Sequence, residues 1–121
     1  MLDHYILGEV DRISPEAPTP ILRATVERYT PGGSANTAAN ITALGGTVSL
    51  VGVIGNDTPG KRLREELKQF GCSMDGVLHI SSRPTGQKTR VVAQGHQIVR
   101  IDREDTEYIS PHAEKKLIEF L

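Results

Sequence analysis

The stretch Pro31–Gly55, PGGSANTAANITALGGTVSLVGVIG, decides the fold of this chain. It opens with Gly32 and Gly33, which can take positive φ angles and carry no Cβ that would hold a ligand away from the backbone. Residues 34–44 are small or compatible with a helix, and the two glycines that follow supply a left-handed end. The stretch therefore predicts a glycine-rich loop and a short helix whose first amides lie beside that loop.

Val48–Ile54 then predicts a strand buried on both faces, because apolar residues follow one another there almost without interruption. The N-terminus of a helix favours an oxygen-rich or anionic ligand. Loop, helix and strand together indicate an α/β protein with a binding site at the loop. The same residues would also suit a helix that only has to turn sharply and pack closely against a sheet. Spacing alone does not separate these two interpretations.

Composition limits the possible functions. With 121 residues, 37% hydrophobic and 24% charged, the chain can form one globular domain with a core, and it has no apolar run long enough to span a membrane. A net charge of -1 excludes a basic field for nonspecific nucleic-acid binding. The single cysteine, Cys72, cannot form an internal disulfide and is expected to be a small buried hydrophobe. Asp3 and His4 stand where a signal peptide needs apolar residues, so we predict a cytoplasmic protein.

One familiar motif is nearly complete but is rejected. Residues Gly55–Lys61 match G-x-x-x-x-G-K between a predicted strand and a predicted helix, the context of a phosphate-binding P-loop. Arg62 replaces the Ser or Thr that would meet magnesium, Pro59 has no amide to donate, and Asp57 would repel phosphate. The segment instead predicts a helix capped by Asp57 or the threonine after it. The buried stripe and the end of this helix are expected at Leu63, Leu67, Phe70 and Gly71.

The sequence predicts extended structure for much of the remaining chain. Met1 and Leu2 are expected to end a strand, which would place Asp3 at a C-terminal strand end, where open α/β sheets bind their ligands. The three prolines of Arg12–Pro20 exclude a helix and a central strand, so an extended edge or a loop is expected. Further strands are expected at Ile21–Ala24, Val26–Tyr29, Val77–Ile80, Gln87–Ala93 and Gln97–Asp102.

Basic residues alternate with apolar ones along the last two predicted strands. Lys88, Arg90 and Arg100 would therefore share one face of a two-stranded ribbon. They can be solvated charges that protect an exposed edge from aggregation, or cations that bind a phosphate group. After the ribbon, Ser110 and Pro111 predict the start of a last helix. The residues of that helix available for a core are Leu117, Ile118, Phe120 and Leu121.

The pattern G-G-x-x-N-x-A at Gly32–Ala38, with Gly55 closing the next strand, resembles the first signature of the ribokinase-like (pfkB) carbohydrate kinases. Ser34 departs from the Gly, Ala or Pro usual there, but it is small enough to keep the shape of the loop. The strings M-L-D-H-Y and R-I-S-P-E-A-P look most like the branch of that family that phosphorylates heptose 7-phosphate. The resemblance implies that the chain is the N-terminal portion of a ribokinase-like α/β/α domain, with a small β lid at about residues 12–30 and 86–102.

The resemblance also implies a function. Complete enzymes of this kind use ATP and Mg²⁺ to phosphorylate a sugar, here at the anomeric hydroxyl of the heptose. The second signature, with the catalytic base and the nucleotide site, has no match in this chain, so the chain alone is expected to be inactive and to bind neither cofactor through its own motifs. Lid strands imply a homodimer. The alternative function is a noncatalytic module for sugar-phosphate binding or dimerisation.

The implied site divides into two groups of residues. Those expected to hold sugar hydroxyls are Asp3, Gly32, Gly33 and Asn36. Those expected near the phosphate are Arg12, Lys88, Arg90 and Arg100. No metal ligands are expected, because the four histidines are scattered and show no ligand spacing.

Overall fold

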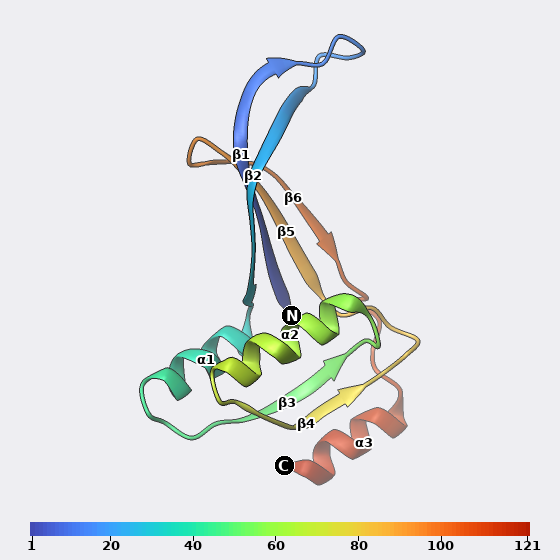
Figure 1. Cartoon of the computed structure of the whole chain (residues 1–121). Coiled ribbons are helices and arrows are strands. Elements are labelled where there is room, and N and C mark those ends of the chain that lie inside the picture. Colours follow the sequence, from blue (N-terminus) through green and yellow to red (C-terminus); the bar gives the residue numbers. More distant parts are fainter.

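The computed structural model describes residues 1–121 and divides them between two sheets and three helices (Figure 1). The elements are β1 (Leu2–Ile13), β2 (Pro20–Pro31), α1 (Ser34–Ala43), β3 (Ser49–Ile54), α2 (Thr58–Gln69), β4 (Ser73–His79), β5 (Gln87–Ala93), β6 (His96–Arg103) and α3 (Pro111–Phe120). One sheet has the order β2-β1-β5-β6, and the other contains the parallel pair β3-β4. This mixture confirms the predicted α/β class.

The β3-β4 sheet and its helices form the body of the molecule. Helices α1 and α2 lie on one side of this sheet and α3 lies on the other (Figure 1). The core cluster consists of Leu2, Ala35, Ala38, Ile54, Leu63, Leu67 and Cys72. Alanines at the packed face of α1 let the helix approach closely. The prediction that β3 is buried on both faces is wrong, because only Ile54 of this strand is fully buried in a sheet of two strands.

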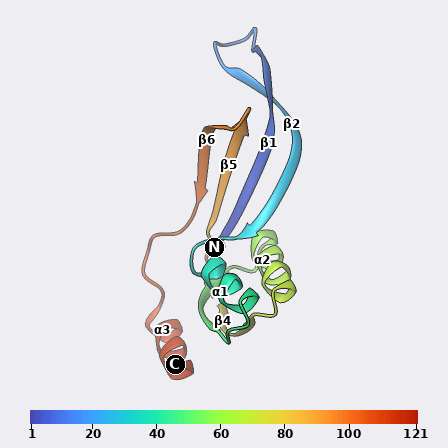
Figure 2. The same ribbon diagram turned by 90° about the vertical axis from the view of Figure 1, so that its left-hand side faces the viewer.

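The four-stranded sheet, called the long sheet below, stands away from the body as a single layer (Figure 2). Its β1 strand pairs antiparallel with β2 and parallel with β5. The expectation that Asp3 ends a strand is wrong, since β1 continues from Leu2 to Ile13. The two short pieces expected after Pro20 are one continuous strand, β2. The long sheet therefore includes residues 2–11, which the predicted lid segments omitted.

Local signals placed the helices correctly. Gly33 has a φ of 57° at the N-cap of α1, and Gly45 has a φ of 83° just beyond its end. Asp57 caps α2 by accepting a hydrogen bond from the Gly60 amide at 2.9 Å. Ser110 caps α3 by accepting one from the Ala113 amide. These ends are set by neighbouring residues alone, which explains why the sequence predicts them.

Predicted burial was less accurate than predicted helix position. Leu63 and Leu67 are buried as expected, but Phe70 is 42% exposed because it follows the last turn of α2. Ile118 and Leu121 of the last helix are 63% and 90% exposed, so they do not belong to a core. Leu117 is partly buried and Phe120 is 42% exposed, so only Ala113 of α3 is fully buried. Phe120 packs against Gly76 of β4, where an added Cβ would lie 2.6 Å from the ring.

Candidate functional site

One face of the long sheet carries two rows of polar side chains. We call it the Asp3 face. In the register of the four strands, the acid row consists of Thr30, Asp3, Lys88 and Asp102. The arginine row, two residues away on each strand, consists of Arg28, Tyr5, Arg90 and Arg100. The predicted shared face of Lys88, Arg90 and Arg100 is therefore confirmed by the strand register.

An ion pair connects the two rows. Arg90 Nη1 lies 2.8 Å from Asp3 Oδ1. The atoms are close, but their angle does not give a well-directed hydrogen bond, and both are buried without any other partner. Contact with the Asp3 carboxylate raises the pKa of Arg90, against a smaller opposing effect of burial. The pair thus retains unused capacity to donate and to accept hydrogen bonds.

A second cluster lies on the other side of Lys88. Lys88 Nζ donates to Asp102 Oδ2 at 2.9 Å. Arg100 donates to the same carboxylate twice, through Nε at 2.9 Å and through Nη2 at 3.0 Å. The hydrogen bond from Lys88 is the main cause that lowers the pKa of Asp102; burial opposes it, and Arg100 adds to it. Both cations are thereby held by a single carboxylate.

The glycine-rich loop contacts this face at Asp3. A Cβ on Gly32 would lie 2.8 Å from Asp3 Cγ, so only glycine leaves room for the carboxylate at its present position. Gly33 has a positive φ and lies beside Met1. Asn36 is exposed in the first turn of α1, and its Oδ1 accepts only a long 3.5 Å hydrogen bond from Asn40. The loop and the charged rows are therefore adjacent.

Arg12 does not belong to this arrangement. It lies at the far end of β1, beside Ile21 of β2. Nine residues separate it from Asp3, which corresponds to about 30 Å along an extended strand. The expectation that Arg12 lies near the phosphate with the other cations is not met within one chain, because β1 runs outward instead of ending at Asp3.

Four residues of the two rows were missing from the predicted site: Thr30, Tyr5, Arg28 and Asp102. Tyr5 lies between two arginines, with the Arg90 and Arg28 guanidinium carbons 5.4 Å and 5.8 Å from its ring centre. Arg28 is the member of the arginine row outside any ion pair, and Asp102 holds two cations. Tyr5 and Asp102 could have been found from strand alternation, since each stands two residues from a predicted site residue.

The P-loop-like segment is structural. Asp57 Oδ1 accepts hydrogen bonds from the Gly60 amide at 2.9 Å and from Thr85 Oγ1 at 2.6 Å. Its Oδ2 accepts from the Thr85 amide at 2.8 Å. Burial tends to raise the pKa of Asp57, but these hydrogen bonds outweigh burial and hold the pKa below its ordinary value. The Asp57 carboxylate thus takes the Gly60 amide of this segment, which a phosphate would need, so these residues do not fit ATP.

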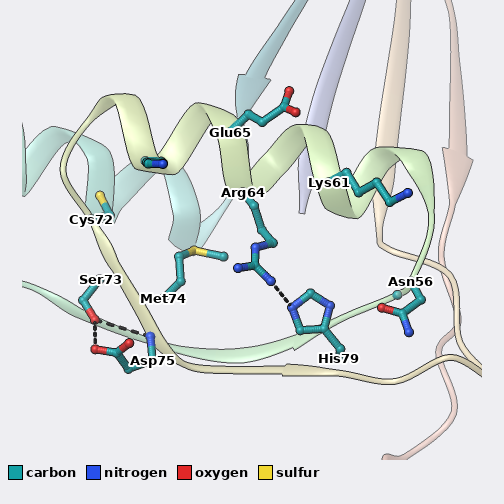
Figure 3. A pocket seen from close by; sticks show the side chains of 11 residues that line it. Asn56, Lys61, Arg64, Glu65, Cys72, Ser73, Met74, Asp75 and His79 are labelled. Atoms are coloured by element: carbon teal, nitrogen blue, oxygen red, sulfur yellow. Dashed lines mark hydrogen bonds between the residues drawn. The ribbon is translucent and has the colours of Figure 1, made fainter.

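A large open hollow lies elsewhere, between α2 and β4 (Figure 3). It encloses about 780 Å³ and contains none of the predicted site residues. Arg64 Nη1 lies 2.6 Å from His79 Nε2 across it. Since arginine stays protonated, His79 accepts through Nε2 and carries its proton on Nδ1. The groups available here do not make a metal site, because no three His, Cys, Asp or Glu side chains come together in the chain.

Known structures define the class to which this architecture belongs. The chain is similar to ribokinase from Arabidopsis thaliana complexed with ribose and ATP, with a TM-score of 0.66 and 25% identity over 84% of this chain and 32% of that chain. It is also similar to a putative sugar kinase from Clostridium perfringens, with a TM-score of 0.71 and 18% identity over 98% of this chain and 38% of that one. The fold is thus the ribokinase-like α/β fold, present here in part.

Sequence comparison gives the family. The profile of the family described as "pfkB family carbohydrate kinase" matches residues 3–120. The chain belongs to this family. It is 46% identical over 98% of its length to the "Bifunctional protein HldE" of Gluconacetobacter diazotrophicus, and 42% identical over 100% to that of Geobacter sulfurreducens. It spans about a quarter of the length of these curated relatives.

None of the helices combines the length and the apolar character needed to cross a membrane.

Proposed function

We propose that the chain is the sugar-binding part of a kinase that phosphorylates heptose 7-phosphate at its anomeric hydroxyl. The observation that carries this proposal is the pair of rows on the Asp3 face, where carboxylates and arginines occupy separate positions along the strands. Carboxylates accept hydrogen bonds from sugar hydroxyls, and arginines bind phosphate in bidentate geometry. A ligand with hydroxyls at one end and a phosphate at the other matches this order.

The spacing of the rows supports a phosphorylated sugar over a free sugar. Residues two apart in a strand are about 6.6 Å apart, which is comparable to the distance from the ring of a heptose to a phosphate on its last carbon. Asp3, with Gly32 beside it, would take the ring hydroxyls, and Asn36 would add a donor and an acceptor from α1. Arg90 and Arg100 would take the phosphate, and Lys88 would assist them from the acid row.

Phosphoryl transfer requires parts that this chain does not provide. ATP would supply the γ-phosphoryl group, and Mg²⁺ would offset its charge. Asp57 already takes the Gly60 amide of the segment that resembles a P-loop, so we assign neither group to that segment. The contribution proposed for this chain is to bind and orient the acceptor sugar, which supplies much of the catalysis in phosphoryl transfer.

Titration of the folded chain with heptose 7-phosphate tests the proposal. Asp3→Ala and Asn36→Ala each remove a hydrogen-bond partner from the buried hydroxyls of the bound sugar, at a cost of about 1–3 kcal/mol. Each variant should therefore weaken binding by about one to two powers of ten. Asp11→Ala is a matched control, because this exposed carboxylate lies on the same strand far from the loop. Unchanged affinity in a folded Asp3→Ala variant would refute the assignment of the site.

A noncatalytic module for sugar-phosphate binding would use the same residues and pass the same titration. An activity assay of the full-length protein separates a noncatalytic module from a kinase. ATP-dependent phosphorylation of heptose 7-phosphate by the full-length protein would support the kinase. We also propose a cytoplasmic location and a homodimer formed through the long sheet, whose strands β2 and β6 expose unpaired edges.

A further inference from the structure

Asp102 is an acid in a cluster that is otherwise suited to binding an anion. It lies opposite Lys88 on the neighbouring strand and two residues from Arg100 on its own strand. Its side chain is 27% exposed, and that of Lys88 is 20% exposed, so the contact is partly shielded from water. If the cations served only to attract phosphate, a carboxylate between them would weaken that attraction. Its presence needs a separate explanation.

The hydrogen bonds show what Asp102 does to the cations. Arg100 presents Nε and Nη2 to the carboxylate, in the bidentate geometry that fixes the plane of a guanidinium. Lys88 Nζ contacts the oxygen that also receives Nη2. The Nη1 group of Arg100 and two protons of the lysine ammonium remain available. Both long side chains are therefore oriented before any ligand arrives, while donors remain free for a phosphate.

We propose that Asp102 is a positioning residue that determines specificity, fixing Lys88 and Arg100 so that they select a sugar phosphate over a free inorganic anion. This inference rests on the proposed function. Without the carboxylate the two cations carry more net charge but no fixed direction, so they attract any anion. With it, binding requires a ligand whose phosphate reaches the free donors while its hydroxyls meet Asp3.

Asp102→Asn tests this inference, because asparagine keeps the shape of the side chain and removes its charge. Titration of the folded chain with heptose 7-phosphate should show affinity lowered by about tenfold, while affinity for inorganic phosphate stays equal or increases. The Nε–H resonance of Arg100 should move toward that of a free guanidinium in the same variant, because an amide oxygen is a weaker acceptor than a carboxylate. Glu104→Gln is the matched control, since it removes an exposed negative charge that forms no ion pair.

Three results would contradict the inference and one would support it. Equal tightening of both ligands in Asp102→Asn would show that the carboxylate only competes with phosphate, and it would overturn the inference. Unchanged affinity for both would also overturn it, leaving an ordinary cross-strand ion pair. A wild-type chain that melts cooperatively but does not bind heptose 7-phosphate would overturn the proposed function together with this inference. Partial recovery of selectivity in Asp102→Glu would support the positioning role of Asp102.

Discussion

The hydrogen bonds between Asp57 and Thr85 should make a single hydroxyl important for the stability of the body. Thr85 is 1% exposed, and its Oγ1 donates to Asp57 while accepting from the Gly55 amide at 2.8 Å. Thr85→Val keeps the shape of the side chain but leaves the buried Gly55 amide without a partner. An unpaired buried donor costs about 1–3 kcal/mol, and a lost hydrogen bond to a charged group costs about 1.5–3 kcal/mol.

We expect a combined loss of about 2–4 kcal/mol, below the sum of the two costs because Asp57 keeps its bonds to two backbone amides. For a chain of this size such a loss corresponds to a drop in Tm of roughly 8–16 °C. Thermal and urea unfolding, followed by circular dichroism, would measure it. Thr106→Val is the matched control, since Thr106 is exposed in a loop. A loss below about 0.5 kcal/mol, the usual range of surface substitutions, would refute the reasoning.

The pH dependence of the free energy of unfolding provides an independent check on the role of the Asp57–Thr85 hydrogen bonds. The pKa of Asp57 is lower in the folded chain than its ordinary value, so its ionised form contributes stability above the unfolded pKa of about 3.9. That contribution is lost as the pH falls below about 4 toward the folded pKa. Thr85→Val removes one cause of the lowered pKa. The difference in stability between wild type and variant should therefore be largest near neutral pH and shrink in acid.

Three other outcomes are expected. The 121-residue chain should show no ATP-dependent sugar phosphorylation, because the second signature of the family has no match in it and Asp57 takes the Gly60 amide of its P-loop-like segment. Turnover by the pure chain would contradict this. Gly32→Ala should displace the Asp3 carboxylate, because the added Cβ would lie 2.8 Å from it. Binding of heptose 7-phosphate should weaken by about tenfold with little change in Tm. An affinity equal to that of the wild type would contradict the packing argument. Sedimentation of the folded protein should show a dimer, with Ile21–Ala24 and Gln97–Asp102 in the contact. The side chain of Ile101 is 56% exposed, so Ile101→Glu should give monomers. A wild-type monomer at high concentration would count against the contact.

The sequence predicts well those features that depend on nearest neighbours. The loop at Gly32, the helix after it and the caps at Asp57 and Ser110 each depend on residues within one helical turn. The same local logic identified the P-loop-like segment as a capped helix. The error at Phe70 has a tertiary origin, because helical spacing shows which residues share a face but not whether another element covers that face.

The position of Asp3 could not be predicted from its neighbours. Beta strands can end or continue after any suitable residue, and a strand that leaves one sheet to enter another looks the same in sequence as one that stops. Here β1 continues for ten residues beyond Asp3, which moves Arg12 to its outer end. Only the pairing of β1 with β2 and β5 reveals this course. The expected site therefore contained one cation that the fold carries away.

Charge balance on the Asp3 face is a consequence of strand register. Alternation predicts that Lys88, Arg90 and Arg100 share a face, and this prediction needs only the local period of a strand. Their partners depend on pairings between distant segments: Asp3 lies beside Lys88 only because β1 and β5 are parallel, and Asp102 lies opposite it only in the observed β5-β6 register. A register change of one residue would turn Asp102 to the other face and leave Lys88 and Arg100 without their shared carboxylate. An anion site inferred from basic residues alone therefore overestimates its positive charge. Here Asp102, which the predicted site omitted, is the carboxylate that gives the site its selectivity in our proposal.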